Sequence, residues 1–271
     1  MTRAILTVFA AAALLVACSR NALTGKSQFT LLPESQLQSM ATTEYQQFLS
    51  SNKVVATTGS KDAEMVRRVG QRITAAVESY YKEKGMADQL SGFKWEYNLV
   101  NDPAVNAWCM PGGKIVVYTG LLPITQNEAA LAAVMGHEVC HALLQHGNQR
   151  MSQGMAQQGL GAALSVALAN KPAATQNLFM TAYGVGSNVL GVLPFSRKHE
   201  LEADRYGLLF TAMAGYNPQE AIALWDRMEK AGGDQKPPEF LSTHPSEGRR
   251  KEQLEKFMPE ALKVYKPVGS K

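Results

Sequence analysis

The sequence predicts a mainly α fold with a small β-sheet, that is, an α+β protein. Apolar residues recur at intervals of three and four over long stretches such as residues 62–84, which is typical of amphipathic helices. Residues 93–100 and 115–118 instead show the short alternating or β-branched pattern of strands. The chain has 271 residues, 45% of them hydrophobic, which is sufficient for one large core.

Local signals indicate where the elements begin and end. The Pro-Gly-Gly sequence at 111–113 is typical of a turn and leads into the second strand. Asn217 is a suitable helix cap, with Pro218 in the first turn. Pro259 is expected to interrupt or end part of the last helix. In total we expect helices at 34–50, 62–84, 127–146, from 217 onward and at 246–265, and strands at 93–100 and 115–118.

The first residues have the features of a bacterial lipoprotein signal peptide. Arg3 precedes an apolar run that ends in a lipoprotein cleavage box at 15–18, and this run is too short to span a bilayer. We therefore expect residues 1–17 to be removed, Cys18 to carry lipid at the membrane and residues 18–34 to form a lipidated tether. Ser19 favours the outer over the inner membrane, so the folded domain, residues 35–271, would face the periplasm.

A metal-binding motif lies within the helix expected at 127–146. His137, Glu138 and His141 form an H-E-x-x-H sequence. Positions four apart lie on one face of a helix, so both imidazoles can bind one zinc ion. Zinc with three protein ligands keeps a water, lowers its pKa from about 15.7 toward about 7, and leaves a nearby carboxylate to accept the proton. The motif therefore indicates hydrolysis of a polar carbonyl bond, with Glu138 as general base.

A second acidic helix offers the third zinc ligand. Glu200 and Asp204 are four residues apart and share one face, so Glu200 can bind zinc while Asp204 accepts the N–H of a ligating imidazole. Glu202 is the competing candidate. It has no acid four residues further on, because that position is Tyr206, and we therefore favour Glu200.

Four sequence blocks, found in the same order, resemble a known family. It is the zinc metallopeptidase family that includes the CAAX prenyl protease, HtpX and BepA. The resemblance implies a zincin-like domain with one zinc ion per chain, the ligands His137, His141 and Glu200, Glu138 as the base and Asp204 behind the ligands. The blocks are Asn106-Ala107-Trp108 through Gly120-Leu121-Leu122, the H-E-x-x-H helix, Arg197 through Asp204, and Thr243-His244-Pro245 with Arg249.

Three further histidines lie outside the H-E-x-x-H motif. By resemblance, His244 approaches the metal, where it either holds a latent state or assists catalysis; the alternative is a histidine in a loop or helix cap. His146 follows His141 by five positions, off the ligand face, and is expected to cap the end of the helix. His199 is expected to point about 100° away from Glu200.

Two further segments are candidates for handling a peptide substrate. The edge strand implied at Asn106, Ala107 and Trp108 can pair with an extended peptide, although the Pro-Gly-Gly turn is equally consistent with an ordinary hairpin. Residues 151–193 are rich in small side chains and are expected to form a flexible insertion that gates the site, without a transmembrane hairpin.

Composition limits the partners and the redox chemistry. A net charge of +4 with scattered charges does not predict a nucleic-acid surface, and the cluster Arg249-Arg250-Lys251 is expected to be a solvated helix face. Cys109 and Cys140 could form a disulfide, but we favour two buried thiols.

Together these features predict a lipid-anchored zinc endopeptidase that hydrolyses peptide bonds of unfolded or misassembled cell-envelope proteins. The alternative is a protease-like chaperone or binding module whose zinc site is latent.

Overall fold

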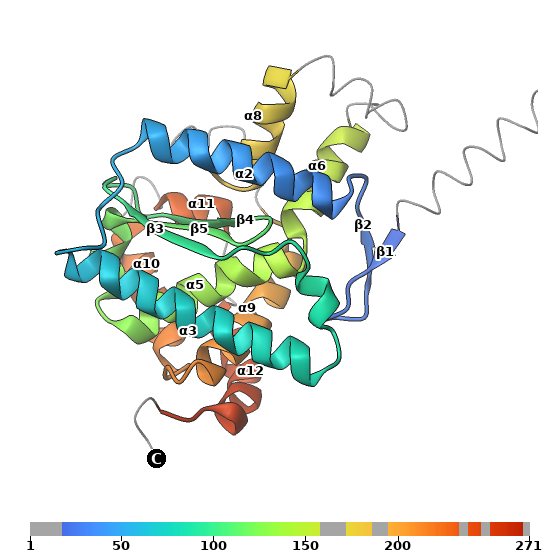
Figure 1. The fold of residues 1–271 in the computed structure, drawn as a ribbon. Coiled ribbons are helices and arrows are strands. Elements are labelled where there is room, and N and C mark those ends of the chain that lie inside the picture. Colours follow the sequence, from blue (N-terminus) through green and yellow to red (C-terminus); the bar gives the residue numbers. More distant parts are fainter. Residues whose placement is uncertain (1–17, 158–171, 186–194, 233–237, 245–249, 268–271) are drawn as a thin grey trace, which may run out of the picture.

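The computed structural model describes residues 18–157, 172–185, 195–232, 238–244 and 250–267. Helices predominate and a three-stranded sheet lies among them, so the predicted fold class is confirmed (Figure 1). The strands are β1 (Cys18–Arg20), β2 (Ser27–Phe29), β3 (Glu96–Val100), β4 (Ala107–Met110) and β5 (Lys114–Tyr118). The helices are α2 (Glu34–Ser51), α3 (Lys61–Glu83), α4 (Leu122–Thr125), α5 (Glu128–Leu143), α6 (His146–Gln157), α8 (Pro172–Ala182), α9 (Arg197–Met213), α10 (Glu220–Gly232), α11 (Glu239–Thr243) and α12 (Arg250–Val264).

The sheet has the order β3-β5-β4, with β3 parallel and β4 antiparallel to the central β5. Alternate residues of β5 point to opposite faces, as the period of two requires. Ile115 and Val117 pack with α3, α5 and α9, whereas Val116 and Tyr118 pack with α2, α6 and α8. All four side chains are buried, so the sheet separates two hydrophobic clusters, with α2 above it and α3 and α5 below (Figure 1).

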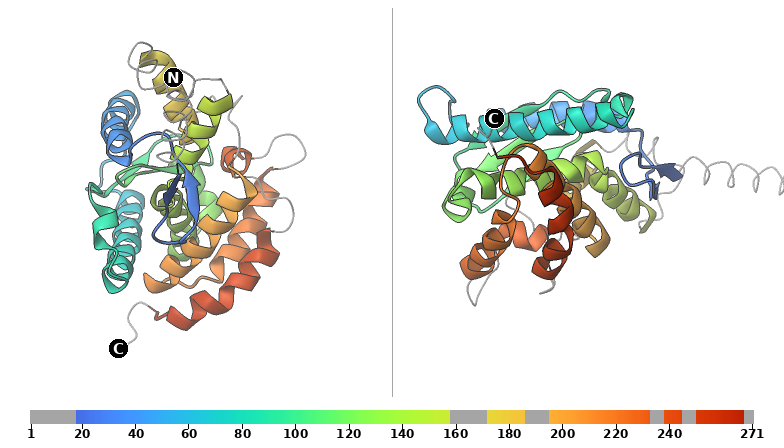
Figure 2. Two further views of the ribbon diagram at one scale, coloured as in Figure 1. Left: turned by 90° about the vertical axis from the view of Figure 1, so that its right-hand side faces the viewer. Right: turned by 90° about the horizontal axis from the view of Figure 1, so that it is seen from below.

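Helix α5 is the central element of the larger cluster. It packs against α3 on one side and against α9 and α10 on the other, and α12 lies on the outer side of α9 (Figure 2). Its residues from Ala130 to Leu143 are buried except Ala133, which is half-buried. A helix covered on all sides holds its side chains in fixed positions, which suits a site that needs exact geometry.

The ends of α5 have clear local causes. The Asn127 side chain accepts a hydrogen bond from the Ala130 amide and so caps the first turn. The helix ends at Leu143 rather than at 146 as expected, because Gln145 adopts a left-handed conformation with φ 52°. His146 therefore begins α6 instead of ending α5.

The segment expected to be a tether is packed against the domain. Strands β1 and β2 form an antiparallel hairpin beside the C-terminal end of α5 (Figures 1 and 2). The buried amides of Asn21 and Gln28 donate hydrogen bonds to the carbonyls of Leu143 and Leu144. These carbonyls lie at a helix end and have no partner within the helix, so the hairpin closes the end of α5.

Three further expectations concern Pro259, membrane-spanning helices and the segments 1–17 and 151–193. The last helix continues through Pro259, so the predicted interruption is wrong; burial of Leu254, Met258 and Ala261 offsets the lost hydrogen bond. Among the described residues, no helix is both long and apolar enough to cross a bilayer. The signal peptide at 1–17 and much of the insertion at 151–193 lie outside the described residues.

Close contact between α5 and α9 depends on two glycines. A Cβ atom on Gly207 would lie 3.0 Å from the backbone nitrogen of His137, and one on Gly136 would lie 3.0 Å from the Gly207 carbonyl oxygen. The two helices can therefore approach closely only without side chains at this crossing.

A Gly207→Ala substitution is expected to push α9 away from His137 and to lower the free energy of unfolding by about 1–3 kcal/mol. Urea unfolding measures the change. Gly154→Ala in α6 is the matched control, since the nearest atom, Leu178 Cδ1, would be 3.6 Å from the new Cβ. The steric explanation is wrong if both variants unfold alike.

Candidate functional site

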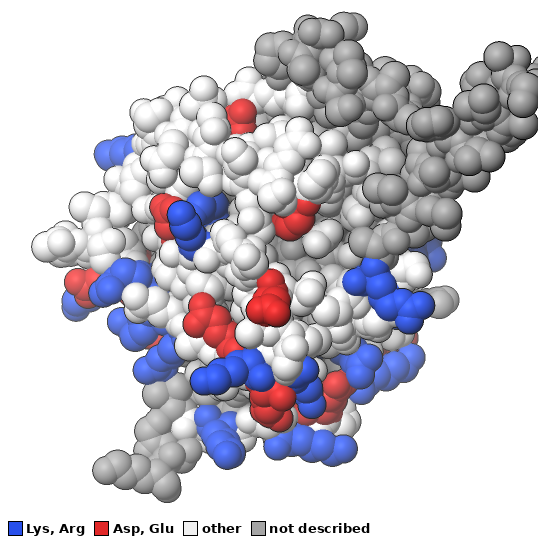
Figure 3. Space-filling view, turned by 45° about the vertical axis from the view of Figure 1, so that its right-hand side comes forward, with Lys and Arg blue, Asp and Glu red and all other residues white. Residues whose placement is uncertain are grey.

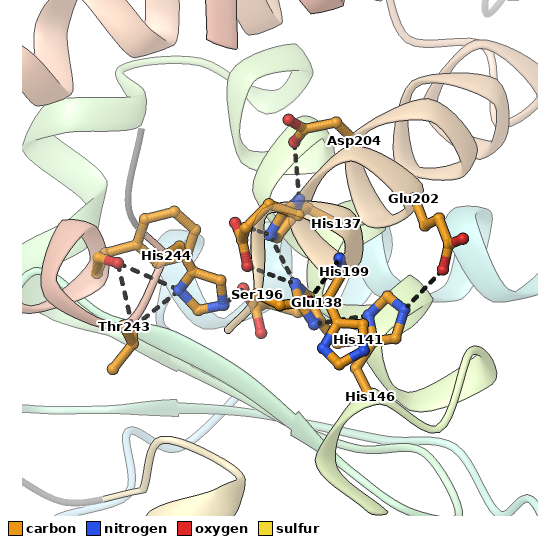
Figure 4. Close-up of polar contacts among 12 residues, drawn as sticks. His137, Glu138, His141, His146, Ser196, His199, Glu202, Asp204, Thr243 and His244 are labelled. Carbon is orange, nitrogen blue, oxygen red and sulfur yellow. Dashed lines mark hydrogen bonds and ion pairs between the residues drawn. The ribbon is translucent and has the colours of Figure 1, made fainter. Parts of the chain in front are cut away.

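Four buried side chains from two helices and the end of a third converge in the domain. His137, His141, Glu200 and His244 each offer one ligand atom, and these atoms lie within 4.8 Å of one another. His137 and His141 come from α5, and His244 from the C-terminal cap of α11 (Figure 4). Glu200 lies in the first turn of α9. Each side chain is at most 5% exposed.

The inner three of these residues fit a metal ion. His137 Nε2 and His141 Nε2 are 2.9 Å apart, and the Glu200 oxygens lie 3.6 and 3.4 Å from them. Tetrahedral zinc with bonds of about 2.0–2.1 Å requires ligand atoms about 3.3 Å apart. Glu200 Oε1 is buried and has no hydrogen-bond partner among the residues that the structure describes, and a bound metal would give this atom a partner.

Glu138 and His244 face this group from the side of the sheet. His244 Nε2 lies 3.5 Å from Glu138 Oε1, and neither atom has a hydrogen-bond partner in the described part of the chain. The other ring nitrogen of His244 lies 3.1 Å from the Phe240 carbonyl oxygen and 2.8 Å from Thr243 Oγ1. His244 is thus both a helix-cap histidine and a side chain whose free nitrogen points into the site, so the two alternatives are not exclusive.

Asp204 lies behind His137, as the i,i+4 spacing from Glu200 suggests. His137 Nδ1 is 3.0 Å from Asp204 Oδ1, which leaves Nε2 directed toward His141 and Glu200. An imidazole that donates Nδ1–H to a carboxylate is fixed in the tautomer that binds metal through Nε2.

Arg250 is a site residue that the sequence reasoning missed. It was expected on a solvated face, but it is 5% exposed and donates to Glu200 Oε2 at 2.8 Å and to Asp204 Oδ1 at 2.6 Å. Its guanidinium carbon lies 3.8 Å from the centre of the Trp225 ring. The neighbouring Lys251 is on the surface, bonded to Asp226, while Arg249 lies outside the described residues.

The electrostatics of the site favour a bound cation. Burial and the nearby Glu200 carboxyl raise the pKa of Glu138 well above its usual range, and burial raises the pKa of Glu200 to about 8 despite Arg250. Burial acts to raise the pKa of Asp204, but the Arg250 charge, His137 and the hydrogen bond from Arg250 together outweigh it, so the pKa lies below its usual value. Burial and the Arg250 charge lower the pKa of His137 to about 4, so this ring is neutral and able to bind metal.

Of the three buried carboxyl groups, Glu200 and Asp204 contact the guanidinium of Arg250, and the charge of Arg150 also acts on Glu200. Protein charges alone leave this site short of positive charge, which a divalent cation would supply. The donor set, two imidazoles and a carboxylate, is typical of catalytic zinc.

The competing ligand Glu202 points away from the site. Its Oε2 lies 3.4 Å from His146 Nε2, and its Oε1 accepts from Lys26 at 2.6 Å (Figure 4). His146 is fully buried beside His141 rather than at an exposed helix end, and His199 stacks on it with ring centres 4.3 Å apart. The choice of Glu200 over Glu202 therefore agrees with the geometry.

The residues of the expected edge strand and the two cysteine thiols are all buried. β4 lies at the edge of the sheet, but Asn106, Ala107 and Trp108 are buried. Cys109 and Cys140 are free and buried, and burial raises the pKa of both thiols.

Comparison with known proteins agrees with this geometry. The chain is 40% identical over 189 residues to the mitochondrial metalloendopeptidase OMA1 of Arabidopsis thaliana, covering 69% of this chain and 37% of that protein. It is 31% identical over 249 residues to the human mitochondrial metalloendopeptidase OMA1, covering 89% and 46%. It is 29% identical over 157 residues to the beta-barrel assembly-enhancing protease of Escherichia coli, covering 56% and 32%.

The chain therefore spans about a third to a half of the length of these relatives. The model of peptidase family M48 matches residues 67–258, a range that includes the ligand group, Asp204 and Arg250. The chain belongs to peptidase family M48.

Proposed function

We propose that this chain is a zinc-dependent endopeptidase. The convergence of His137, His141 and Glu200, with Glu138 alongside, is the observation that carries the proposal. Zinc bound there would polarise the scissile carbonyl and activate water for attack. Glu138 would take the proton from that water and pass it to the leaving amine, while Asp204 holds His137 in the required tautomer.

Metal removal tests this function. Chelation of the purified full chain is expected to abolish cleavage of casein, and stoichiometric zinc is expected to restore it. Zinc content by elemental analysis should be one ion per chain before chelation. Cleavage that persists after complete removal of metal would contradict the proposal.

We also propose that the chain is anchored at Cys18 and acts on unfolded or misassembled envelope proteins. The lipoprotein-like residues 1–18 support the anchor. The Escherichia coli relative is a beta-barrel assembly-enhancing protease, which supports misassembled envelope proteins as clients, whereas the OMA1 relatives are mitochondrial. A fatty-acid label that is retained by a Cys18→Ser variant would disprove the anchor.

No nucleic-acid function is proposed. On the face shown in Figure 3, positive and negative side chains are interspersed over the lower half, and much of the upper described surface is uncharged. This face therefore lacks the continuous stripe of positive charge that is typical of nucleic-acid binding.

A latent metal site is the second candidate, because α11 both supplies His244 to the ligand group and contacts the residues that precede the edge strand β4. His244, at the end of α11, reaches the ligand group, and Glu239 of α11 accepts from Asn106 beside the edge strand at 3.0 Å. The Phe240 amide also donates to the Val105 carbonyl. Displacement of α11 would therefore withdraw His244 and expose the strand for a peptide.

A further inference from the structure

A second buried cluster lies on the side of His141 away from the other ligands. His146 Nδ1 is 3.1 Å from His141 Nδ1, and His146 Nε2 is 3.4 Å from Glu202 Oε2. Lys26 in the N-terminal hairpin donates to the other oxygen of Glu202. A chain of contacts thus runs from the candidate metal ligand His141 to the hairpin. Figure 4 shows its part from His141 through His146 to Glu202.

If His141 binds metal through Nε2, the donors and acceptors along these contacts can be assigned in only one way. The Nε2 atom of His141 faces His137 and Glu200, so its proton must be on Nδ1. That N–H can donate to His146 Nδ1 only if His146 carries its own proton on Nε2. This second proton then points to the Glu202 carboxylate, which can only accept when it is ionised.

The contacts of Glu202 agree with this assignment. Lys26 donates to Glu202 Oε1 at 2.6 Å, so the carboxylate that faces His146 has a cationic partner on its other oxygen. His146 is fully buried, so water does not compete for its nitrogens.

We propose that His146 is a positioning residue that, together with Glu202 and Lys26, fixes the tautomer and orientation of the metal ligand His141. The two ligand histidines are then supported differently: Asp204 accepts directly from His137, whereas Glu202 acts on His141 through an intervening imidazole. The inference rests on the metal site of the proposed function.

The test measures the zinc dissociation constant of the full chain by competition with a chromogenic chelator. His146→Phe keeps the ring shape but removes the acceptor, and it is expected to weaken zinc binding about 10–100-fold. His146→Asn keeps an acceptor oxygen at the position of Nδ1 and is expected to restore most of the loss. In the cobalt-loaded protein, the visible absorption of the Phe variant should shift, and that of the Asn variant should stay close to that of the unmodified chain.

His199→Phe is the matched control. His199 is buried in the same cluster and stacks on His146, but its Nδ1 has no hydrogen-bond partner among the described residues. Zinc affinity and the cobalt spectrum should be unchanged in this variant. An equal loss in the His199 and His146 variants would mean that packing, and not the hydrogen bond, matters, and would overturn the inference.

A second variant covers the case in which His146→Phe does not fold. Glu202→Gln keeps the side-chain shape, lies at the less buried end of the chain of contacts, and removes the charge that accepts from His146; a loss of about 3–10-fold is expected. Unchanged affinity in the folded His146 or Glu202 variant overturns the positioning role alone, whereas an unmodified chain that binds no zinc overturns the proposed function as well.

Discussion

A Glu138→Gln variant is expected to cleave unfolded protein about 10²–10⁴-fold more slowly than the unmodified chain while it retains its zinc. Glutamine has the shape of glutamate but cannot accept a proton. Glu138 is not among the four residues that could hold the ion, so the metal site should stay intact. Initial rates of fluorescent casein cleavage, measured beside zinc content, give both results in one preparation.

Glu200→Gln is the comparison that separates base from ligand. This substitution removes a ligand charge, so activity and zinc are expected to fall together. A Glu138→Gln variant that cleaves at the original rate would exclude Glu138 as the base. If the zinc-loaded unmodified chain also fails to cleave but binds unfolded clients, the latent chaperone is the better description.

Replacement of Arg250 by Leu should produce the largest change in stability, a loss of about 3–5 kcal/mol in the free energy of unfolding. Arg250 bridges Glu200 and Asp204 with two nitrogen atoms in a fully buried position. Without it, two buried carboxyl groups lose their cationic partner. Arg250→Lys should rescue little, because an ammonium cannot reach two carboxylates with the fixed fork of a guanidinium.

Urea unfolding in the presence of chelator measures this loss without a contribution from bound metal. Lys251→Leu is the control one residue along α12. Lys251 is about one third exposed and pairs with Asp226 and Glu229 at the surface, so a change below about 1 kcal/mol is expected. Similar losses in the two variants would show that Arg250 acts as an ordinary helix residue.

The contrast between Asp204 and Arg250 shows which part of the site sequence reasoning can find. Glu200 and Asp204 lie one helical turn apart, so local spacing predicts that they serve the same metal site. Arg250 lies 50 residues after Glu200 and 46 residues after Asp204, and it meets them only because α12 packs on α9. Its charged neighbours in the sequence suggest a solvent-exposed position, and no local period shows that α9 and Trp225 cover it.

The position of His146 was missed for a different reason. In a continuous helix, a spacing of five from His141 would place His146 off the ligand face. Gln145 ends that helix in a left-handed conformation that non-glycine residues adopt rarely and without a strong sequence signal. The turn brings His146 back beside His141.

The docked hairpin of residues 18–29 also limits where the proposed enzyme could work. Cys18 stands at the first position of β1, and Lys26, only eight positions on, already contacts Glu202 next to the candidate metal site. With lipid on Cys18, the catalytic body would have no flexible spacer and would rest directly on the bilayer. Its range of action would then be set by the radius of the domain itself, so that only clients at the membrane surface come within reach.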